Sequence, residues 1–261
     1  MVTRSDAIGS RGSASAPSAL ESRHPERRVL ECQDLKSPEF EDASPVASPS
    51  ERLRLAELLA TRLCHDFSGP LGTLMGSLEM LAEEPESAEE AMTLAADVAV
   101  GLAARLQLLR AAWAGATGPL GIAEFCNLAS GLQTRRSRLD FVMLDTEGQL
   151  SAAAARVALN VLMLASDCLG GSGVVHVGGN AQREVLVRID GPRAAWPAGL
   201  AGYLAQDALA WQAVGRNTGI EASHGLQAPL TALIARSCNI RLSLLMAGAR
   251  DVPPPLLIQL G

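Results

Sequence analysis

The sequence predicts an α plus α+β fold, in which an antiparallel pair of long helices is followed by a domain of mixed helices and strands. The 261 residues are 48% apolar but only 3% aromatic, and this composition favours helices packed through small and γ-branched side chains. Apolar residues recur at heptad spacing up to about residue 118, and helical and strand patterns alternate from there on. We therefore expect three segments, 1–48, 49–118 and 119–261.

Charge and cysteine content exclude several classes of protein. The net charge is −6 and Lys36 is the only lysine, so no basic stripe is available for nucleic acid. Five cysteines are scattered singly along the sequence, which indicates a reducing compartment rather than a disulfide framework. They are Cys32, Cys64, Cys126, Cys168 and Cys238. The N-terminus has no apolar signal-peptide core, and no run approaches 18 apolar residues free of charge or glycine. We expect a cytoplasmic protein that does not enter a membrane.

The first segment, 1–48, is rich in Ser, Pro, Arg and Glu, with apolar residues only in ones and twos. Such a segment cannot offset its ordering entropy by burial, and we expect a disordered tail. His24 lies within it and is assigned no role.

Two helices are predicted in the second segment. Ser48 and Pro49 are typical of an N-cap and a first helical residue, and the helix from about 49 to 83 carries apolar residues at heptad spacing. These are Phe67, Leu71, Leu74, Leu78 and Leu81. Ser87, with Glu90 three residues later, predicts a capping box that starts the second helix.

The length of these helices predicts an oligomer. Each has roughly 30 residues and therefore spans about 45 Å. A single antiparallel pair of that length cannot cover both of its apolar stripes. We expect two chains to combine as a homodimer with a four-helix bundle.

The third segment, 119–261, has the pattern of an α+β domain. Helices are expected at about 121–134, 150–168, 198–212 and 227–237. Strands are expected at about 139–144, 174–177, 185–190, 240–246 and 256–260. Gly178-Gly179-Asn180 predicts a hairpin turn between the second and third of these strands.

The candidate site lies in one short stretch of the first helix, Leu63–Leu71. In the heptad register His65 falls at position b, outside the bundle where a partner can reach it, and Asp66 is adjacent at c. A neutral imidazole is a nucleophile near neutral pH. A neighbouring carboxylate can orient the ring and stabilise charge as the nitrogen attacks phosphorus. Pro70 removes a helical hydrogen bond just past the histidine.

Other uses of the histidines were weighed against this one. An isolated His–Asp pair is most often an ordinary surface pair, but the proline and the heptad hairpin centred on His65 favour phosphoryl chemistry. Cys64 and His65 diverge by about 100° around a helix and cannot both face one ion, so no metal site is expected. His176 lies in a strand and is expected to be packed, and His224 lies in a loop and is expected to be solvated. A hydrolase triad built from these histidines is not supported, because the sequence has no G-x-S-x-G elbow.

Two blocks of sequence resemble a known family. His65–Leu71 resembles the H-[ED]-x-x-x-P-L phosphoacceptor box of sensor histidine kinases. Leu63–Gly72 is similar to the L-C-H-D-x-x-x-P-x-G block of histidine phosphotransferases of the ChpT type, and Arg105–Trp113 is similar to their R-L-x-x-x-R-x-A-[FW] stretch. The resemblance covers about residues 50–261. It implies that the third segment is a Bergerat-like α/β sandwich, a degenerate form of the histidine-kinase ATPase domain.

A nucleotide site should be missing from that domain. A kinase of this type holds Mg²⁺ with paired asparagines on a helix. Asn160 matches the first, but Leu164 stands at the second and cannot bind a metal. The stretch 190–193 lacks the closing glycine of D-x-G-x-G, and 215–219 is only a weak echo of the second glycine-rich turn. We expect neither ATP nor another cofactor or metal in this chain.

The resemblance implies a histidine phosphotransferase of a phosphorelay. His65 would accept a phosphoryl group from the Asp of a hybrid kinase's receiver domain and pass it to the Asp of response regulators. Asp66 would orient or activate the ring, and Mg²⁺ would be bound in the receiver. The receiver-docking surface would be formed by Phe67, Gly69, Pro70 and Leu71. Two alternatives stay open, an ATP-dependent histidine kinase and a non-catalytic dimeric scaffold that binds receivers.

Overall fold

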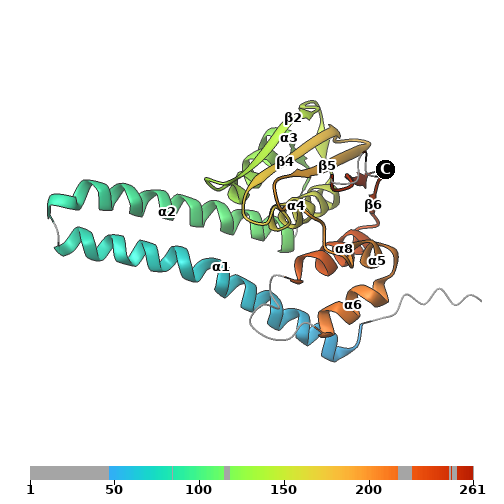
Figure 1. The fold of residues 1–261 in the computed structure, drawn as a ribbon, viewed down its shortest axis with the longest axis horizontal. Coiled ribbons are helices and arrows are strands. Elements are labelled where there is room, and N and C mark those ends of the chain that lie inside the picture. The colour runs from blue at the N-terminus through green and yellow to red at the C-terminus, as the bar shows by residue number, and fades with distance from the viewer. Residues whose placement is uncertain are drawn as a thin grey trace, which may run out of the picture. The chain divides into compact units, whose positions relative to one another are not determined.

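The computed structural model describes residues 47–83, 85–114, 118–216, 225–246, 248 and 252–260. These residues belong to one compact unit, Ala43–Gly261, which consists of a helical hairpin and a mixed sheet region (Figure 1). The predicted tail lies outside the described residues except for its last two positions. His24, Cys32 and His224 lie outside them as well.

The first helix, α1, runs over Pro49–Glu83, as predicted. Its start is a reciprocal capping box between Ser48 and Glu51. The Ser48 N–H donates to Glu51 Oε2 at 2.7 Å, and the Glu51 N–H donates to Ser48 Oγ at 3.2 Å. These hydrogen bonds hold the pKa of the Glu51 carboxyl below its usual value.

The second helix starts differently from the prediction. A 3₁₀ turn, Pro85–Ser87, leads into α2 (Ala88–Leu109), which continues as a π-helical turn over Arg110–Ala114. The Ser87 side chain makes no capping hydrogen bond, so the capping box predicted for Ser87 and Glu90 is wrong. The reason is the backbone of Ser87, which closes the 3₁₀ turn at φ −100° and ψ 7° instead of the extended conformation of an N-cap.

The predicted heptad stripe of α1 is partly exposed in the single chain. Leu71 and Leu78 are 46% and 50% exposed, whereas Phe67, Leu74 and Leu81 are half-buried. The fully buried side chains of α1 are Leu58, Arg62 and Ser77. Periodicity correctly marked an apolar face, part of which the single chain leaves uncovered.

The mixed region begins with a small two-stranded sheet, β1 (Leu120–Gly121) with β3 (Gln149–Leu150). Its remaining strands are β2 (Ser137–Leu144), β4 (Gly173–Asn180), β5 (Glu184–Asp190), β6 (Arg241–Leu244) and β7 (Leu256–Gln259). Its helices are α3 (Ile122–Ala129) with a 3₁₀ turn over Ser130–Leu132, α4 (Ala152–Asp167), α5 (Leu200–Ala205), α6 (Asp207–Arg216) and α8 (Gln227–Ser237).

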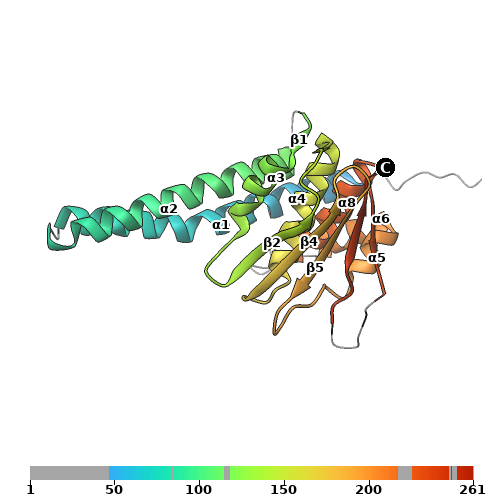
Figure 2. The same cartoon turned by 90° about the horizontal axis from the view of Figure 1, so that it is seen from above.

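The five-stranded sheet has the order β2-β4-β5-β7-β6, with β2 and β4 parallel and the other pairs antiparallel. Helices α4 and α8 cover one face of it (Figure 2). Along β5 the inward residues Val185, Val187 and Ile189 are buried, and their neighbours are more exposed. Helix α4 is buried over almost its whole length and forms the centre of the core.

Two connections in this region were predicted wrongly. The glycines expected in a turn at 178–180 lie within β4, and the turn is formed by residues 181–183, because the Asn180 side chain accepts a hydrogen bond from the Gln182 N–H at 2.8 Å. Gly179 has φ +109°, and a Cβ there would lie 2.4 Å from the Glu184 carbonyl oxygen. The helix expected at 198–212 is two helices, because Gln206 is extended between α5 and α6.

Candidate functional site

His65 lies near the middle of α1 with its side chain 59% exposed, as the heptad register predicted. The helix continues through Pro70, which has no N–H. The carbonyl of Asp66 therefore receives no i→i−4 hydrogen bond from that position. The imidazole is accessible on a continuous helical surface.

Asp66 does not face solvent as its register position suggested. Its side chain is 17% exposed, and its Oδ2 accepts a hydrogen bond from Arg105 of α2 at 2.6 Å. The other oxygen, Oδ1, lies 3.6 Å from His65 Nδ1, which is longer than a hydrogen bond. One carboxylate oxygen is thus anchored across the hairpin while the other is directed at the imidazole.

A second arginine extends this ion-pair network to the mixed region. The Arg62 side chain is only 6% exposed, and its Nε lies 3.9 Å from Asp66 Oδ2. Its guanidinium also donates to Asp167 Oδ2, at the end of α4, at 2.7 Å. This ion-pair network was not predicted from the sequence. The i,i+4 spacing of Arg62 and Asp66 could have indicated that these two residues pair, but no local pattern pointed to Asp167.

The four residues predicted to dock receivers point in different directions. Gly69 follows His65 by one helical turn and shares its side of α1. Pro70 lines a groove of about 350 Å³ between α1 and α2, together with Asp66, Thr73 and Arg105. Phe67 is half-buried and packs against the core, and Leu71 belongs to the exposed apolar stripe. Only Gly69 is next to the imidazole face.

Two further glycines continue that face. Gly72 and Gly76 lie seven and eleven residues after His65, which places them on the same side of α1 as Gly69. A Cβ added at any of the three glycines would meet no atom within 4 Å. The helix beyond the histidine therefore presents bare backbone to a partner.

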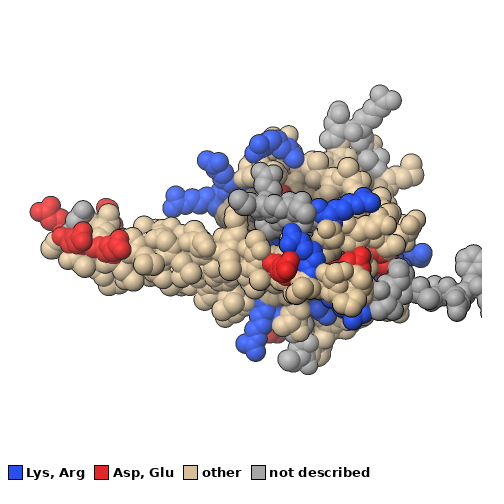
Figure 3. Space-filling model, turned by 90° about the horizontal axis from the view of Figure 1, so that it is seen from below, with Lys and Arg blue, Asp and Glu red and all other residues tan. Residues whose placement is uncertain are grey.

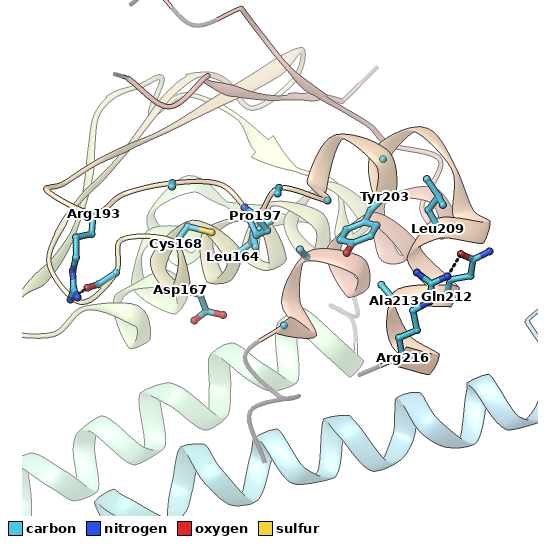
Figure 4. A pocket seen from close by; sticks show the side chains of 17 residues that line it. Leu164, Asp167, Cys168, Arg193, Pro197, Tyr203, Leu209, Gln212, Ala213 and Arg216 are labelled. Atoms are coloured by element: carbon cyan, nitrogen blue, oxygen red, sulfur yellow. Dashed lines mark hydrogen bonds between the residues drawn. The ribbon is translucent and has the colours of Figure 1, made fainter. Parts of the chain in front are cut away.

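A cavity lies in the mixed region, beside α4, α5 and α6 (Figure 4). It has a volume of about 810 Å³ and includes Leu164, the residue that stands where a second asparagine would be needed. Arg193 and Arg216 lie at opposite ends of it, while Tyr203 lies between them. Part of the predicted glycine-rich turn, 217–219, is outside the described residues.

Asn160 makes structural hydrogen bonds. It is fully buried, and its Nδ2 donates to the carbonyl of Ala112, in the π-helical turn, at 2.7 Å. Its Oδ1 accepts from Gln227 Nε2 at 3.2 Å. Arg156 donates to the carbonyl of Trp113 at 2.9 Å. Arg156 and Asn160 therefore tie α4 to the end of the hairpin.

The pKa values of two further groups, the Cys168 thiol and the Asp140 carboxyl, are shifted by their surroundings. Burial, reinforced by the charge of Asp167, raises the pKa of the Cys168 thiol to about 12. His176 Nδ1 lies 2.9 Å from Asp140 Oδ2, and the pKa of that carboxyl is lowered, mainly by the Val142 backbone N–H and then by His176. Within the described ranges, no three His, Cys, Asp or Glu side chains gather as a metal site.

The helical hairpin with an exposed histidine and the mixed region that follows it agree with the pattern by which the sequence resembles sensor histidine kinases and histidine phosphotransferases. Residues 122–250 match the family model of the histidine phosphotransferase C-terminal domain. This match agrees with the resemblance of the sequence to histidine phosphotransferases of the ChpT type.

Two individual proteins are similar to this chain. Protein phosphotransferase ChpT of Brucella abortus (strain 2308) is 32% identical over 142 residues, which are 53% of this chain and 62% of that protein. The match thus spans less than two thirds of the relative. A solved structure titled "1.7 Angstrom Structure of a Bacterial Phosphotransferase" has a TM-score of 0.60 at 22% identity, covering 83% of this chain and 98% of that one. The latter shows a shared fold.

Proposed function

We propose that this protein is a phosphorelay histidine phosphotransferase, which accepts a phosphoryl group from the Asp of one receiver domain onto His65 and passes it to the Asp of another. The observation that carries the proposal is the exposed imidazole of His65 beside a carboxylate that Arg105 anchors from the opposite helix. The match of residues 122–250 to the histidine phosphotransferase C-terminal domain supports it.

The position of Asp66 supports a separate role for each nitrogen of the ring. Nδ1 faces Asp66 Oδ1, so Nε2 is the nitrogen turned toward a partner. In the first transfer Nε2 forms a bond to phosphorus as the bond to the receiver's carboxylate oxygen breaks, and the carboxylate leaves with the electron pair. Nδ1 keeps its proton, and the positive charge that develops on the ring faces Asp66. In the second transfer another carboxylate attacks phosphorus, and the imidazole leaves.

Arg105 is a positioning residue in this scheme, because it acts through Asp66. Arg105 holds Asp66 Oδ2 and thereby leaves Asp66 Oδ1 directed at the imidazole. Only a small movement would shorten the 3.6 Å between Asp66 Oδ1 and His65 Nδ1 to hydrogen-bonding distance. Transfer of this kind depends on positioning and charge stabilisation. The Mg²⁺ that neutralises the phosphoryl oxygens would be supplied by the receiver, and this chain would need no cofactor of its own.

The Bergerat-like domain would not supply ATP chemistry. The asparagine that could hold Mg²⁺ is committed to the Ala112 carbonyl, and Leu164 replaces the second one. The cavity of about 810 Å³ beside Leu164 is the observation that favours the alternative, an ATP-dependent kinase. The experiment below separates the two.

The exposed apolar stripe supports a homodimer through a four-helix bundle. Leu71, Met75 and Leu78 of α1 and Leu106 of α2 are all strongly exposed in the single chain. Among the described helices, Pro85–Ala114 is the one long and apolar enough to cross a membrane, with a mean hydropathy of 1.4 over 18 residues. We assign its apolar surface to a second copy and place the protein in the cytoplasm. Introducing negative charge by L71E/L78E should yield monomers in light scattering, whereas V142E on β2 should not.

One labelling experiment tests the function. The protein is incubated first with labelled ATP and then with a receiver domain that carries labelled aspartyl phosphate. We expect acid-labile label on the wild type only from the receiver, and none on H65A or H65Q, which should still dimerise. Label from ATP alone would establish a kinase. Receiver binding without a labelled histidine would establish a scaffold, and label on H65A would refute the assignment of His65.

A further inference from the structure

An arginine cluster stands out on this acidic chain. The net charge is −6, yet three arginines occur within four residues at Arg135, Arg136 and Arg138, where the chain enters β2. All three are exposed. None of their guanidiniums forms a salt bridge or hydrogen bond with a residue that the structure describes. Arg138 lies near enough to Asp140 to help lower the pKa of that carboxyl, whereas the charges of Arg135 and Arg136 are directed at solvent or at a partner.

The turn that carries the cluster is fixed by hydrogen bonds. Thr134 Oγ accepts from the N–H groups of Arg136 and Ser137 at 3.2 and 3.0 Å. The Thr134 N–H donates to the Ser137 carbonyl at 2.9 Å, and the Arg136 carbonyl accepts from Gly173 at 2.9 Å. Because the backbone is held at both ends of the turn, little ordering is needed when a partner binds.

The cluster lies close to the histidine along the hairpin. The 3₁₀ turn Ser130–Leu132 rests on α2 so closely that a Cβ at Gly131 would lie 2.8 Å from the carbonyl oxygen of Ala104. The next residue of α2, Arg105, binds Asp66. Because Arg135 follows Gly131 by four positions in the chain, their Cα atoms are at most about 14 Å apart.

The mixed region also lies on the side of α1 that His65 faces. His65 follows Arg62 by three residues and is its neighbour around the helix. Arg62 contacts Asp167 of the mixed region. Figure 3 shows basic side chains where the hairpin leaves this region, and acidic side chains both at the far tip of the hairpin and beside the mixed region. A partner seated on His65 and the glycine face therefore meets positive charge beside it.

We propose that Arg135, Arg136 and Arg138 form a second contact for the receiver domain and bind the acidic rim of its phosphorylation site. This inference rests on the proposed function. An aspartate that is phosphorylated with a Mg²⁺ ion has further carboxylates around it to hold the metal, so the receiver's docking face is negative. Complementary charges at the rim of an interface accelerate encounter and fix orientation.

The experiment compares two variants with the same change in charge. R135E/R136E reverses the cluster, and R183E/R241E reverses two exposed arginines at the β4–β5 turn and on the opposite edge strand, β6. Phosphoryl uptake from a phosphorylated receiver is measured against receiver concentration at low and high NaCl. Phosphoramidate serves as a small donor of phosphoryl groups to histidine that requires no docking.

We expect R135E/R136E to raise the receiver KM roughly tenfold at low salt, with the rate at saturation nearly unchanged. The difference from wild type should shrink as salt screens the charges. Uptake from phosphoramidate should be unaffected, and R183E/R241E should behave as wild type. An unchanged KM in R135E/R136E, or an equal rise in both variants, would overturn the inference. Failure of the wild type to take label from any receiver would instead refute the proposed function.

Discussion

Replacing Arg105 by methionine tests whether the ion pair across the hairpin serves the transfer step. Methionine keeps most of the apolar stem and removes the charged group that holds Asp66 Oδ2 at 2.6 Å. Both side chains are less than a quarter exposed, at 21% and 17%, so solvent screens the pair only in part. Arg62, at 3.9 Å, is too distant to replace the hydrogen bond without moving.

The magnitude follows from the kind of interaction. Hydrogen bonds to charged groups contribute about 1.5–3 kcal/mol when they are not fully exposed. If about 1.5–3 kcal/mol of this interaction serves to orient Asp66 Oδ1 in the transfer step, R105M should transfer the phosphoryl group roughly 10- to 100-fold more slowly than wild type. Asp66→Asn removes the negative charge itself and is expected to slow transfer by at least about 100-fold.

A double-mutant cycle gives the decisive measurement. Single-turnover transfer from a phosphorylated receiver is timed for wild type, R105M, D66N and R105M/D66N, with circular dichroism to verify folding. If Arg105 acts through Asp66, the double variant should be within about threefold of D66N, because the anchored group is already gone. Arg105→Lys should recover part of the rate, and exposed Arg52→Met should have none of these effects. Losses that multiply in the double variant would show that Arg105 acts by another route.

Three further outcomes are expected. Gly72→Gln should raise the melting temperature, since glycine weakens a helix interior by about 1 kcal/mol. The same substitution should raise the receiver KM, because the new side chain covers the bare helix face beside His65. A higher KM without added stability would contradict this use of the glycine. Asn160→Ala should lower the free energy of unfolding by about 2–3 kcal/mol in urea titration, because the buried partners in Ala112 and Gln227 lose a hydrogen bond. Cys168 should resist thiol reagents at pH 8 while exposed Cys64 reacts, since a pKa of about 12 leaves about one thiolate in ten thousand; reaction of C64S at Cys168 would contradict its burial.

Local features of the site were predictable from sequence, and long-range ones were not. The bounds of α1 follow from Ser48 and Pro49 and from an uninterrupted pattern, and the exposure of His65 follows from its register. The heptad pattern also marked an apolar face, but it could not tell which surface would cover that face. The pairing of Asp66 with Arg105 across the hairpin was not predictable for this reason.

The contacts between distant segments had no signal in a single sequence. Arg62 and Asp167 are 105 residues apart, and Asn160 and Ala112 are 48 apart. Each pair depends on how the mixed region packs against the hairpin, and periodicity carries no information about that packing. The turn at 181–183 was missed for a related reason, since Gly178 and Gly179 permit close strand pairing as well as a turn.

These long-range contacts bear on the source of the phosphoryl group. A domain that carries its own nucleotide to a histidine on the hairpin has to move relative to that hairpin. Here α4 is hydrogen-bonded to the hairpin at two places: Asn160 and Arg156 bind the π-helical turn, and Asp167 binds Arg62. Asn160, the side chain that matches a metal ligand of kinases, is one of these contacts. Under the proposed function, a second region held to the hairpin by these contacts would be poorly suited to delivering a nucleotide and would offer a surface against which a receiver is oriented.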